Sequence, residues 1–145
     1  MTIRQARLDD LEPLTKLFNG YRVFYQQPYD LKGASDFLHQ RLTKQDSIIL
    51  VALDRYENPI GFTQLYPSFS SVSMQPLWIL NDLYVTPDNR GTGTGKALIL
   101  AAQELAINRG WKGLVLETAM DNPAQQLYER TGWRQDGMLH YSWSP

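Results

Sequence analysis

The sequence contains no cysteine, and its only histidines are His39 and His140. The absence of cysteine excludes disulfides, thiolate nucleophiles, and zinc or iron–sulfur sites that depend on cysteine ligands. The two histidines lack the spacing that places a ligand pair on one helix face, so a metal site would have to rest on carboxylates. We therefore expect a protein without a metal cofactor.

Neither sign of charge is in excess, because 14 Lys and Arg residues stand against 15 Asp and Glu residues, for a net charge of −1. Nucleic-acid binding and polybasic membrane anchoring both show as a strong basic excess, so we expect neither partner. Long hydrophobic runs are also missing. The longest, residues 48–53, is far too short for a bilayer span, and residues 1–7 lack the apolar core of a signal peptide. These absences predict a cytoplasmic enzyme or binding protein.

The chain has the length and composition of one globular domain. Its 145 residues are 43% apolar and 20% charged, and no linker, repeat or low-complexity tract divides them. We therefore expect a single domain over residues 1–145. The predicted elements come in a mixed order: helices, antiparallel strands, then a strand–loop–helix–strand unit. This order predicts an α/β fold, in the broad sense that includes α+β, with a parallel strand pair around the long helix.

Hydrophobic periodicity and turn residues predict the individual elements. Helices are expected at about 11–24, 33–43, 96–108 and 122–130, and strands at about 2–6, 47–53, 60–66, 77–85 and 114–118, with one or two last strands at 133 and 138–143. Asp9 or Asp10 is expected to cap the first helix, and Pro123 to take the first position of the last. The serine-rich stretch 67–76 predicts a polar loop.

The most informative segment joins the strand that ends at Val85 to the helix that starts near Lys96. It carries glycines at positions 91, 93 and 95. Glycine lets backbone N–H groups approach a ligand closely, and a helix N-terminus adds unpaired donors and the positive end of a dipole. With Arg90 and Lys96 at its rim, the segment predicts a phosphate-binding loop. The alternative is a flexible turn with structural glycines.

Two common nucleotide-binding loops fail at specific positions. The nucleoside-triphosphate loop requires glycine where Arg90 stands and a hydroxyl residue where Ala97 stands. The dinucleotide pattern requires its third glycine at Lys96 or Leu98. The pattern that remains is Arg-x-x-Gly-x-Gly over residues 90–95.

This pattern resembles the coenzyme A pyrophosphate loop of the GNAT superfamily of N-acetyltransferases. The preceding Leu-Tyr-Val-x-Pro, from Leu83 to Pro87, is similar to the family's central strand. Residues 116–133, with Asp-Asn-Pro-Ala and Leu-Tyr-Glu-Arg-x-Gly-Trp, resemble its next strand and helix. The resemblance covers about Ile79 to Trp133. It implies a mixed, mostly antiparallel sheet with a central splayed parallel strand pair, flanked by helices.

The resemblance also implies an activity: transfer of an acetyl group from acetyl-coenzyme A to a primary amine of a small molecule or protein, without a metal. Tyr128 matches the family's general acid, which protonates the departing thiolate; the alternative is a packed aromatic beside Leu127. In the splayed strand, Leu83 and Val85 would supply main-chain contacts to the pantetheine arm. The positions that match the family's cofactor contacts are Leu83, Tyr84, Val85, Arg90, Gly91, Thr92, Gly93, Thr94, Gly95, Lys96 and Asn122.

The acceptor amine has to be neutral when it attacks, and a free alkyl amine has a pKa of about 10.4, so a base or a water path is needed. Asp82 on the central strand is the first candidate, and Glu117 and Asp30 are others. The stretch from Asn81 to Val85 is similar to that of diamine acetyltransferases, in which a glutamate commonly precedes the aspartate. Here that residue is Asn81, which argues against polyamine specificity.

The acceptor pocket has the fewest signals in the sequence. Aromatic rings near the end of the first helix can hold an alkyl-ammonium group by cation–π attraction. The candidate acceptor-binding residues are Tyr25, Tyr29, Gln64 and Asn81.

Three functional classes are compatible with these residues. The first is an acetyl-coenzyme A-dependent N-acetyltransferase acting on a small-molecule or peptide amine. The second is a non-catalytic acyl-coenzyme A-binding module, and the third is a nucleotide-binding protein, which Ala97 disfavours. The strand-like segment 140–143 either pairs across a homodimer or closes its own sheet.

Overall fold

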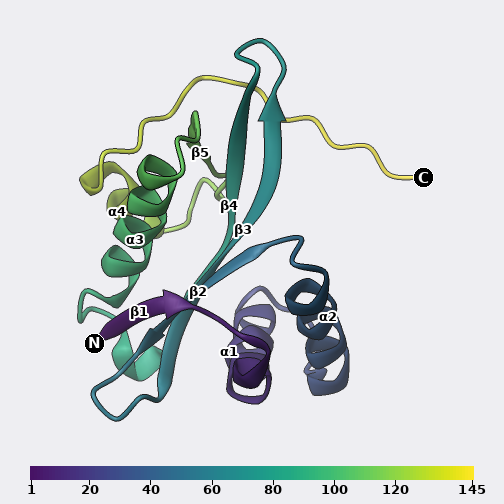
Figure 1. Cartoon of the computed structure of the whole chain (residues 1–145), viewed down its shortest axis with the longest axis vertical. Coiled ribbons are helices and arrows are strands. Elements are labelled where there is room, and N and C mark those ends of the chain that lie inside the picture. Colours follow the sequence, from purple (N-terminus) through teal and green to yellow (C-terminus); the bar gives the residue numbers. More distant parts are fainter.

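The computed structural model describes all 145 residues, arranged as one five-stranded sheet with helices on both faces (Figure 1). The strands are β1 (Thr2–Gln5), β2 (Ile48–Leu53), β3 (Pro59–Ser70), β4 (Gln75–Val85) and β5 (Gly113–Val115). The helices are α1 (Leu11–Phe24), α2 (Leu31–Lys44), α3 (Thr94–Asn108) and α4 (Ala124–Arg130), with 3-10 turns at Leu8–Asp10 and Pro87–Asn89. None of the helices combines the length and apolar character that crossing a bilayer requires.

The sheet is antiparallel from β1 to β4 and parallel between β4 and β5, which confirms the predicted mixed α/β fold. The parallel pairing is short. It begins with Leu77 opposite Gly113 and ends with Ile79 opposite Val115. Beyond Ile79, β4 continues to Val85 with a partner on only one side. The two strands therefore separate, as the resemblance implied, and leave one edge of β4 open.

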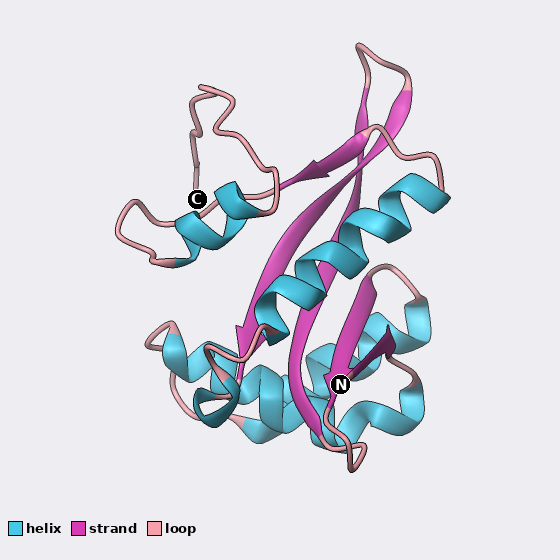
Figure 2. Cartoon of the chain, turned by 90° about the vertical axis from the view of Figure 1, so that its left-hand side faces the viewer, coloured by secondary structure: helices cyan, strands magenta, loops and turns pink.

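The core lies on both faces of the sheet because β2 is buried along its whole length. Alternate residues of a strand point to opposite faces. Val51 therefore packs toward α1 and α2, whereas Leu50 packs toward α3. Figure 2 shows α3 lying across one face of the sheet. A continuous apolar run such as 48–53 is what a strand covered on both faces requires.

A β-bulge interrupts β4 in its middle. Gln64 of β3 pairs with Asp82 and Leu65 with Leu80, so Asn81 is one extra residue in β4. The bulge resets the alternation of side chains. As a result Leu80 and Leu83 both pack on the α3 side, and Asn81 is exposed.

Three sequence-based predictions were wrong. The serine-rich stretch 67–76 is not a loop, because β3 and β4 pair through it and only residues 71–74 form the turn. The strand predicted at 114–118 ends at Val115. The predicted last strands at 133 and 138–143 do not form, because residues 131–145 do not pair with any strand of the sheet. Serine-rich composition and strand-like alternation are local signals, whereas strand pairing depends on the rest of the fold.

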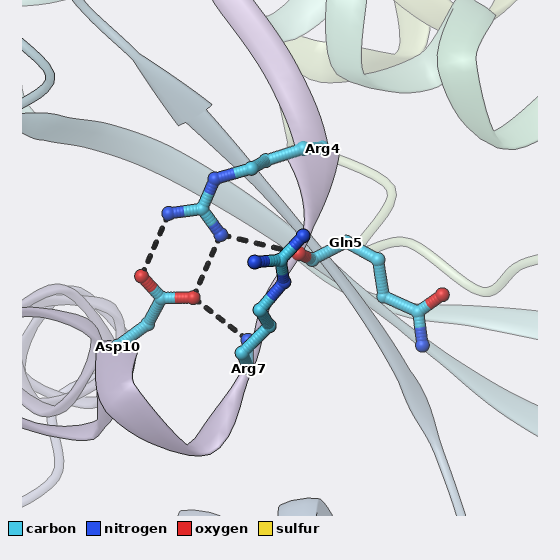
Figure 3. Close-up of polar contacts among 4 residues, drawn as sticks. All are labelled: Arg4, Gln5, Arg7 and Asp10. Carbon is cyan, nitrogen blue, oxygen red and sulfur yellow. Dashed lines mark hydrogen bonds and ion pairs between the residues drawn. The ribbon is translucent and has the colours of Figure 1, made fainter.

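The N-terminal cap of the first helix also differs from the prediction. Asp10 precedes α1, but its side chain does not cap it. Instead the carboxylate accepts two hydrogen bonds from the Arg4 guanidinium, both at 2.8 Å, and one from the Arg7 backbone N–H at 2.7 Å (Figure 3). This bidentate pair ties β1 to the start of α1, and the Arg4 hydrogen bonds hold the pKa of Asp10 below its ordinary value. Likewise, Pro123 stands before the first helical residue of α4.

Candidate active site

The glycine loop between β4 and α3 requires glycine at two positions for conformational reasons. Gly91 has φ +75° and Gly93 has φ +89°, in the left-handed region that side chains disfavour. At neither position would a Cβ meet another atom within 4 Å. Gly95 differs, because a Cβ there would lie 3.3 Å from Leu127 Cδ2. Two glycines therefore shape the backbone, and the third allows α3 to lie close to α4.

The backbone N–H groups of this loop have no backbone hydrogen-bond acceptors. The backbone hydrogen bonds of the turn end with Arg90 N donating to Pro87 O, and they resume with Ala97 N donating to Gly93 O. The N–H groups of residues 91–96 have no backbone acceptor between these two bonds. A run of free amides at the N-terminus of a helix is an arrangement that binds phosphate.

Side chains brace the loop from both sides. Arg90 Nε donates to Val85 O at 3.0 Å, and its guanidinium lies 5.2 Å from the ring centre of Phe24 and 5.7 Å from that of Tyr84. Thr92 Oγ1 donates to Asn89 O at 2.7 Å and lies 3.0 Å from the hydroxyl oxygen of Thr94. Thr94 is buried.

A cleft of about 520 Å³ lies against this loop, the open edge of β4 and α4. It gathers most of the residues that the sequence analysis singled out. Those that line it are Tyr25, Asn81, Leu83, Tyr84, Val85, Arg90, Gly91, Gly93, Gly95, Lys96, Asn122 and Tyr128. Lining residues that had no assigned role include Leu80, Asn89, Thr118 and Leu127. Phe24, one of the aromatic residues expected near the end of the first helix, also lines the cleft. Its contact with Arg90 could not be predicted, because it joins segments distant in sequence.

The remaining predicted site residues lie outside the lining of the cleft. Thr92 and Thr94 face each other within the loop, and Tyr29 is 71% exposed elsewhere. Asp30 accepts a hydrogen bond from Gly33 N at 2.9 Å and caps α2. Of the alternative bases, only Glu117 lines the cleft.

Tyr128 is held in the cleft by α4. Its ring centre lies 6.0 Å from that of Trp133, and its side chain packs against the core on the α3 side. Burial, with a smaller contribution from Tyr25, raises the pKa of the Tyr128 hydroxyl above its ordinary value. The hydroxyl is protonated at neutral pH, as an ordinary tyrosine is, and its raised pKa makes it a weaker acid than a free phenol.

Asn122 is positioned by the start of α4. Its Oδ1 accepts a hydrogen bond from Ala124 N at 2.9 Å. The amide Nδ2 takes part in no hydrogen bond and remains available to a ligand in the cleft.

Asp82 lies just behind the cleft, in a buried polar cluster. It is 3% exposed, and its carboxylate accepts hydrogen bonds from Gln64 Nε2 at 2.6 Å and from Asn81 Nδ2 at 2.9 Å. Gln64 in turn accepts from Ser47 Oγ at 2.9 Å. None of the five ion pairs of the molecule includes Asp82. The carboxylate is thus satisfied by neutral donors, and Asn81 connects it to the cleft.

Two tyrosines share the surroundings of this carboxylate. Burial first, and then the nearby charge of Asp82, raises the pKa of Tyr21 and of Tyr66 above the ordinary range. Both hydroxyls therefore stay protonated and add dipoles, not charges, around Asp82.

Comparison with known proteins agrees with this architecture. The sequence profile of the Acetyltransferase (GNAT) family matches residues 14–133. The chain is 49% identical over 143 residues to the Bacillus subtilis (strain 168) protein named "Uncharacterized N-acetyltransferase YhfO", covering 97% of this chain and 95% of that protein. It is 30% identical over 141 residues to a Haemophilus influenzae protein named "Probable acetyltransferase", covering 89% and 97%.

A solved structure extends the agreement to three dimensions. The crystal structure of a probable acetyltransferase, 37% identical in sequence, superposes with a TM-score of 0.94 over 100% of this chain and 97% of the other. These matches establish the class first: the protein is an acetyltransferase. More particularly, the chain belongs to the Acetyltransferase (GNAT) family, whose co-substrate is acetyl-coenzyme A. The resemblance noted in the sequence is therefore confirmed.

The cleft has the features that such a co-substrate needs. The free amides of residues 91–96, with Arg90 and Lys96 beside them, suit a pyrophosphate. The open edge of β4 near Leu83 has no neighbouring strand and can offer main-chain groups to an amide-bearing arm, whereas at Val85 the carbonyl oxygen already accepts from Arg90 Nε. The residues present therefore fit coenzyme A.

Proposed function

We propose that this enzyme transfers the acetyl group of acetyl-coenzyme A to a primary amine of a small molecule or peptide, by direct attack, with Tyr128 as general acid. The observation that carries the proposal is the shared cleft. One cavity is lined by the glycine loop, by the open edge of β4 and by Tyr128, whose hydroxyl is protonated at neutral pH. The cofactor's two ends and the proton donor thus belong to one site.

In this proposal the chain holds the co-substrate mainly through its backbone. The amides of residues 91–96 bind the pyrophosphate, and Arg90 and Lys96 neutralise its charge. Leu83 offers main-chain groups to the pantetheine arm, and Asn122 adds its free amide nitrogen. Thr92 and Thr94 keep the loop in shape through the contact between their hydroxyls.

Bound acetyl-coenzyme A supplies the acetyl group as a thioester. Tyr128 donates its proton to the departing sulfur as the carbon–sulfur bond breaks. A phenol has a pKa of about 10 and a thiol about 8.5, and burial raises that of Tyr128 further. Transfer to a fully formed thiolate is therefore uphill, which favours a proton that moves in concert with bond breaking.

The acceptor amine is assigned to the part of the cleft near Tyr25 and Asn81. Asp82 lies behind Asn81 without a cationic partner, and its negative charge favours an amine in this region. It accepts the proton of the attacking amine directly or through water. Gln64 keeps the Asp82 carboxylate in place. Tyr29, exposed outside the cleft, has no part in this scheme.

The test is release of free thiol from acetyl-coenzyme A in the presence of a panel of amines: diamines, amino acids, aminoglycosides, and peptides with free N-termini or lysines. We expect thiol release that depends on one class of amine. If coenzyme A binds and no amine accelerates thiol release above the rate without acceptor, the protein would instead be a module that binds the cofactor without transferring its acetyl group.

A further inference from the structure

Four polar side chains form a continuous row of hydrogen bonds from the start of β2 to the active-site cleft. Ser47 precedes β2, Gln64 lies on β3, and Asn81 and Asp82 lie on β4; these three strands are neighbours in the sheet (Figure 1). Ser47 Oγ donates to Gln64 Oε1 at 2.9 Å, and Gln64 Nε2 donates to Asp82 Oδ2 at 2.6 Å. Asn81 Nδ2 donates to Asp82 Oδ1 at 2.9 Å. We call these four residues the polar row.

The chemistry of each group fixes the direction of every hydrogen bond in the polar row. An ionised carboxylate only accepts hydrogen bonds, so the amides on both sides of Asp82 have to turn their nitrogen atoms toward it. Gln64 then presents its oxygen to Ser47, whose hydroxyl has to donate. Asn81 keeps its own oxygen free, because Oδ1 takes part in no hydrogen bond. Asp82 therefore determines that the free end of the Asn81 amide is the carbonyl end.

Burial makes the two central residues of the polar row depend on these bonds. The Gln64 side chain is fully buried, and Asp82 is almost as inaccessible. A buried polar group that loses its partner costs far more free energy than the same group in water. Gln64 Oε1 accepts no hydrogen bond other than the one from Ser47. Removal of the Ser47 hydroxyl therefore leaves an unsatisfied oxygen in the core and frees the Gln64 amide to turn away from Asp82.

Only one end of the polar row reaches the cleft. Asn81 lines it, whereas Ser47, Gln64 and Asp82 do not. The Asn81 side chain makes no hydrogen bond except the one to Asp82, so nothing else in the molecule fixes the orientation of its amide. The position of the Asp82 carboxylate therefore controls how Asn81 meets a molecule in the cleft.

We propose that Ser47 is a positioning residue for the acceptor amine. Acting through Gln64, it holds the Asp82 carboxylate so that the Asn81 carbonyl faces the acceptor and accepts a hydrogen bond from it. The inference rests on the proposed function, which assigns the acceptor to this end of the cleft. A neutral primary amine has two N–H groups and one lone pair. One N–H can donate to Asn81 Oδ1 while the lone pair stays free to attack the thioester.

A double-mutant cycle in the full-length protein tests whether Ser47 acts through Gln64. The readout is kcat/KM for the most active amine of the panel of diamines, amino acids, aminoglycosides and peptides. Ser47→Ala should lower it about 5- to 10-fold and leave the Kd for coenzyme A unchanged. Gln64→Met keeps the length of the side chain without its amide and should lower kcat/KM at least as much. In the Gln64→Met background, Ser47→Ala should add nothing, and losses that multiply would overturn the proposal.

Two further variants separate the hydrogen bond of Ser47 from a general loss of stability. Ser47→Thr keeps the hydroxyl and should recover most of the activity that Ser47→Ala loses. Thr15→Val is the matched control, because it removes a buried hydroxyl that donates to Leu11 O at 2.7 Å within α1, outside the polar row. It should leave kcat/KM unchanged whatever it does to thermal stability. Equal losses of kcat/KM in Ser47→Ala and Thr15→Val would show a merely structural role for Ser47 and overturn the proposal.

Nuclear magnetic resonance of the side-chain amides gives a readout that needs no turnover. The NH2 signals of Asn81 report its hydrogen bond to Asp82. In the ligand-free protein these signals should shift in Ser47→Ala and stay in place in Thr15→Val. Unmoved Asn81 signals in Ser47→Ala would overturn the proposal, whatever the activity. If the signals shift and the wild-type protein acetylates no amine of the panel, the coupling from Ser47 to Asn81 is supported and the proposed function fails.

Discussion

The two ends of the candidate active-site cleft differ in what they present: free backbone amides at one end and side chains at the other. The glycine loop presents the amides of residues 91–96, which one short segment supplies. The proposed acceptor end combines Tyr25 from the end of α1 with Asn81 and the buried Asp82 from the bulge of β4. In the proposed scheme the backbone end binds the co-substrate common to the family, and the side-chain end binds the acceptor. Substitutions at the two ends should therefore have separate effects, on the Kd for coenzyme A at one end and on kcat/KM for the amine at the other.

Tyr128→Phe should have the largest effect. It removes the proton donor and leaves the ring in place, so kcat should fall by about 100-fold or more. The Kd for coenzyme A should change little, because backbone groups hold the cofactor. Steady-state thiol release and calorimetric titration measure the two quantities. Tyr141→Phe, in the exposed C-terminal segment, is the matched control. Unchanged turnover would remove Tyr128 from the acid role.

Gly93→Val should weaken the binding of coenzyme A without affecting the acceptor end of the cleft. Valine is strained at φ +89°, so the amides move away from the pyrophosphate, and the Kd for coenzyme A should rise about 10- to 100-fold. Gly110→Val is a matched control because Gly110 has φ +67° beyond the end of α3, outside the cleft. It should lose comparable thermal stability and keep the wild-type Kd. Equal cofactor affinity in the Gly93 variant would refute the assignment of the loop.

Asp82→Asn should act at the acceptor end alone. The substitution keeps the shape and removes the charge, so kcat/KM for the amine should fall about 10-fold with little change in the Kd for coenzyme A. The pH dependence of kcat/KM should move to higher pH, because the amine then has to lose its proton without help. Asp36→Asn, in an exposed ion pair with Lys32, is the control. An Asp82 variant with wild-type kcat/KM and pH profile would exclude the proposed role.

Asp10→Asn should have the smallest effect. It should change neither the Kd for coenzyme A nor kcat/KM for the amine. The Arg4 hydrogen bonds lower the pKa of Asp10, so the stability from this pair is present above the unfolded-state pKa of 3.8 and is lost as the pH falls through the lower folded value. We expect a loss of about 1 kcal/mol at pH 7 that shrinks toward zero as the pH falls through the folded-state pKa of Asp10. Thermal unfolding at pH 7 and over a series of acid pH values measures it. A deficit that does not depend on pH would contradict the ion-pair explanation.

The position of the glycine loop could be predicted from the sequence because its signal is local. Gly91 and Gly93, between a strand and a helix, adopt the left-handed conformation, and the amides of residues 91–96 are free. That these amides bind coenzyme A stays a prediction. The splayed parallel pair followed from the same resemblance and is confirmed. The family and the enzyme class were also predicted correctly.

The features that could not be predicted depend on contacts between distant segments. The bulge at Asn81 exists only through pairing with Gln64 and Leu65, so nothing in the local sequence marks it. The outer half of the β3–β4 hairpin is polar because it extends past the core, and its composition therefore resembled a loop. Residues 138–143 have the pattern of a strand, but a strand requires a pairing partner, and these residues pair with no strand of the sheet.

In the proposed mechanism, one cleft holds coenzyme A by the glycine loop and brings its sulfur to Tyr128. A crystal structure of the wild-type chain with coenzyme A is the decisive measurement. We expect the pyrophosphate on the amides of residues 91–96 and the thiol sulfur within about 4 Å of the Tyr128 hydroxyl oxygen. Coenzyme A bound elsewhere, or bound in the cleft with its sulfur out of reach of Tyr128, would contradict it.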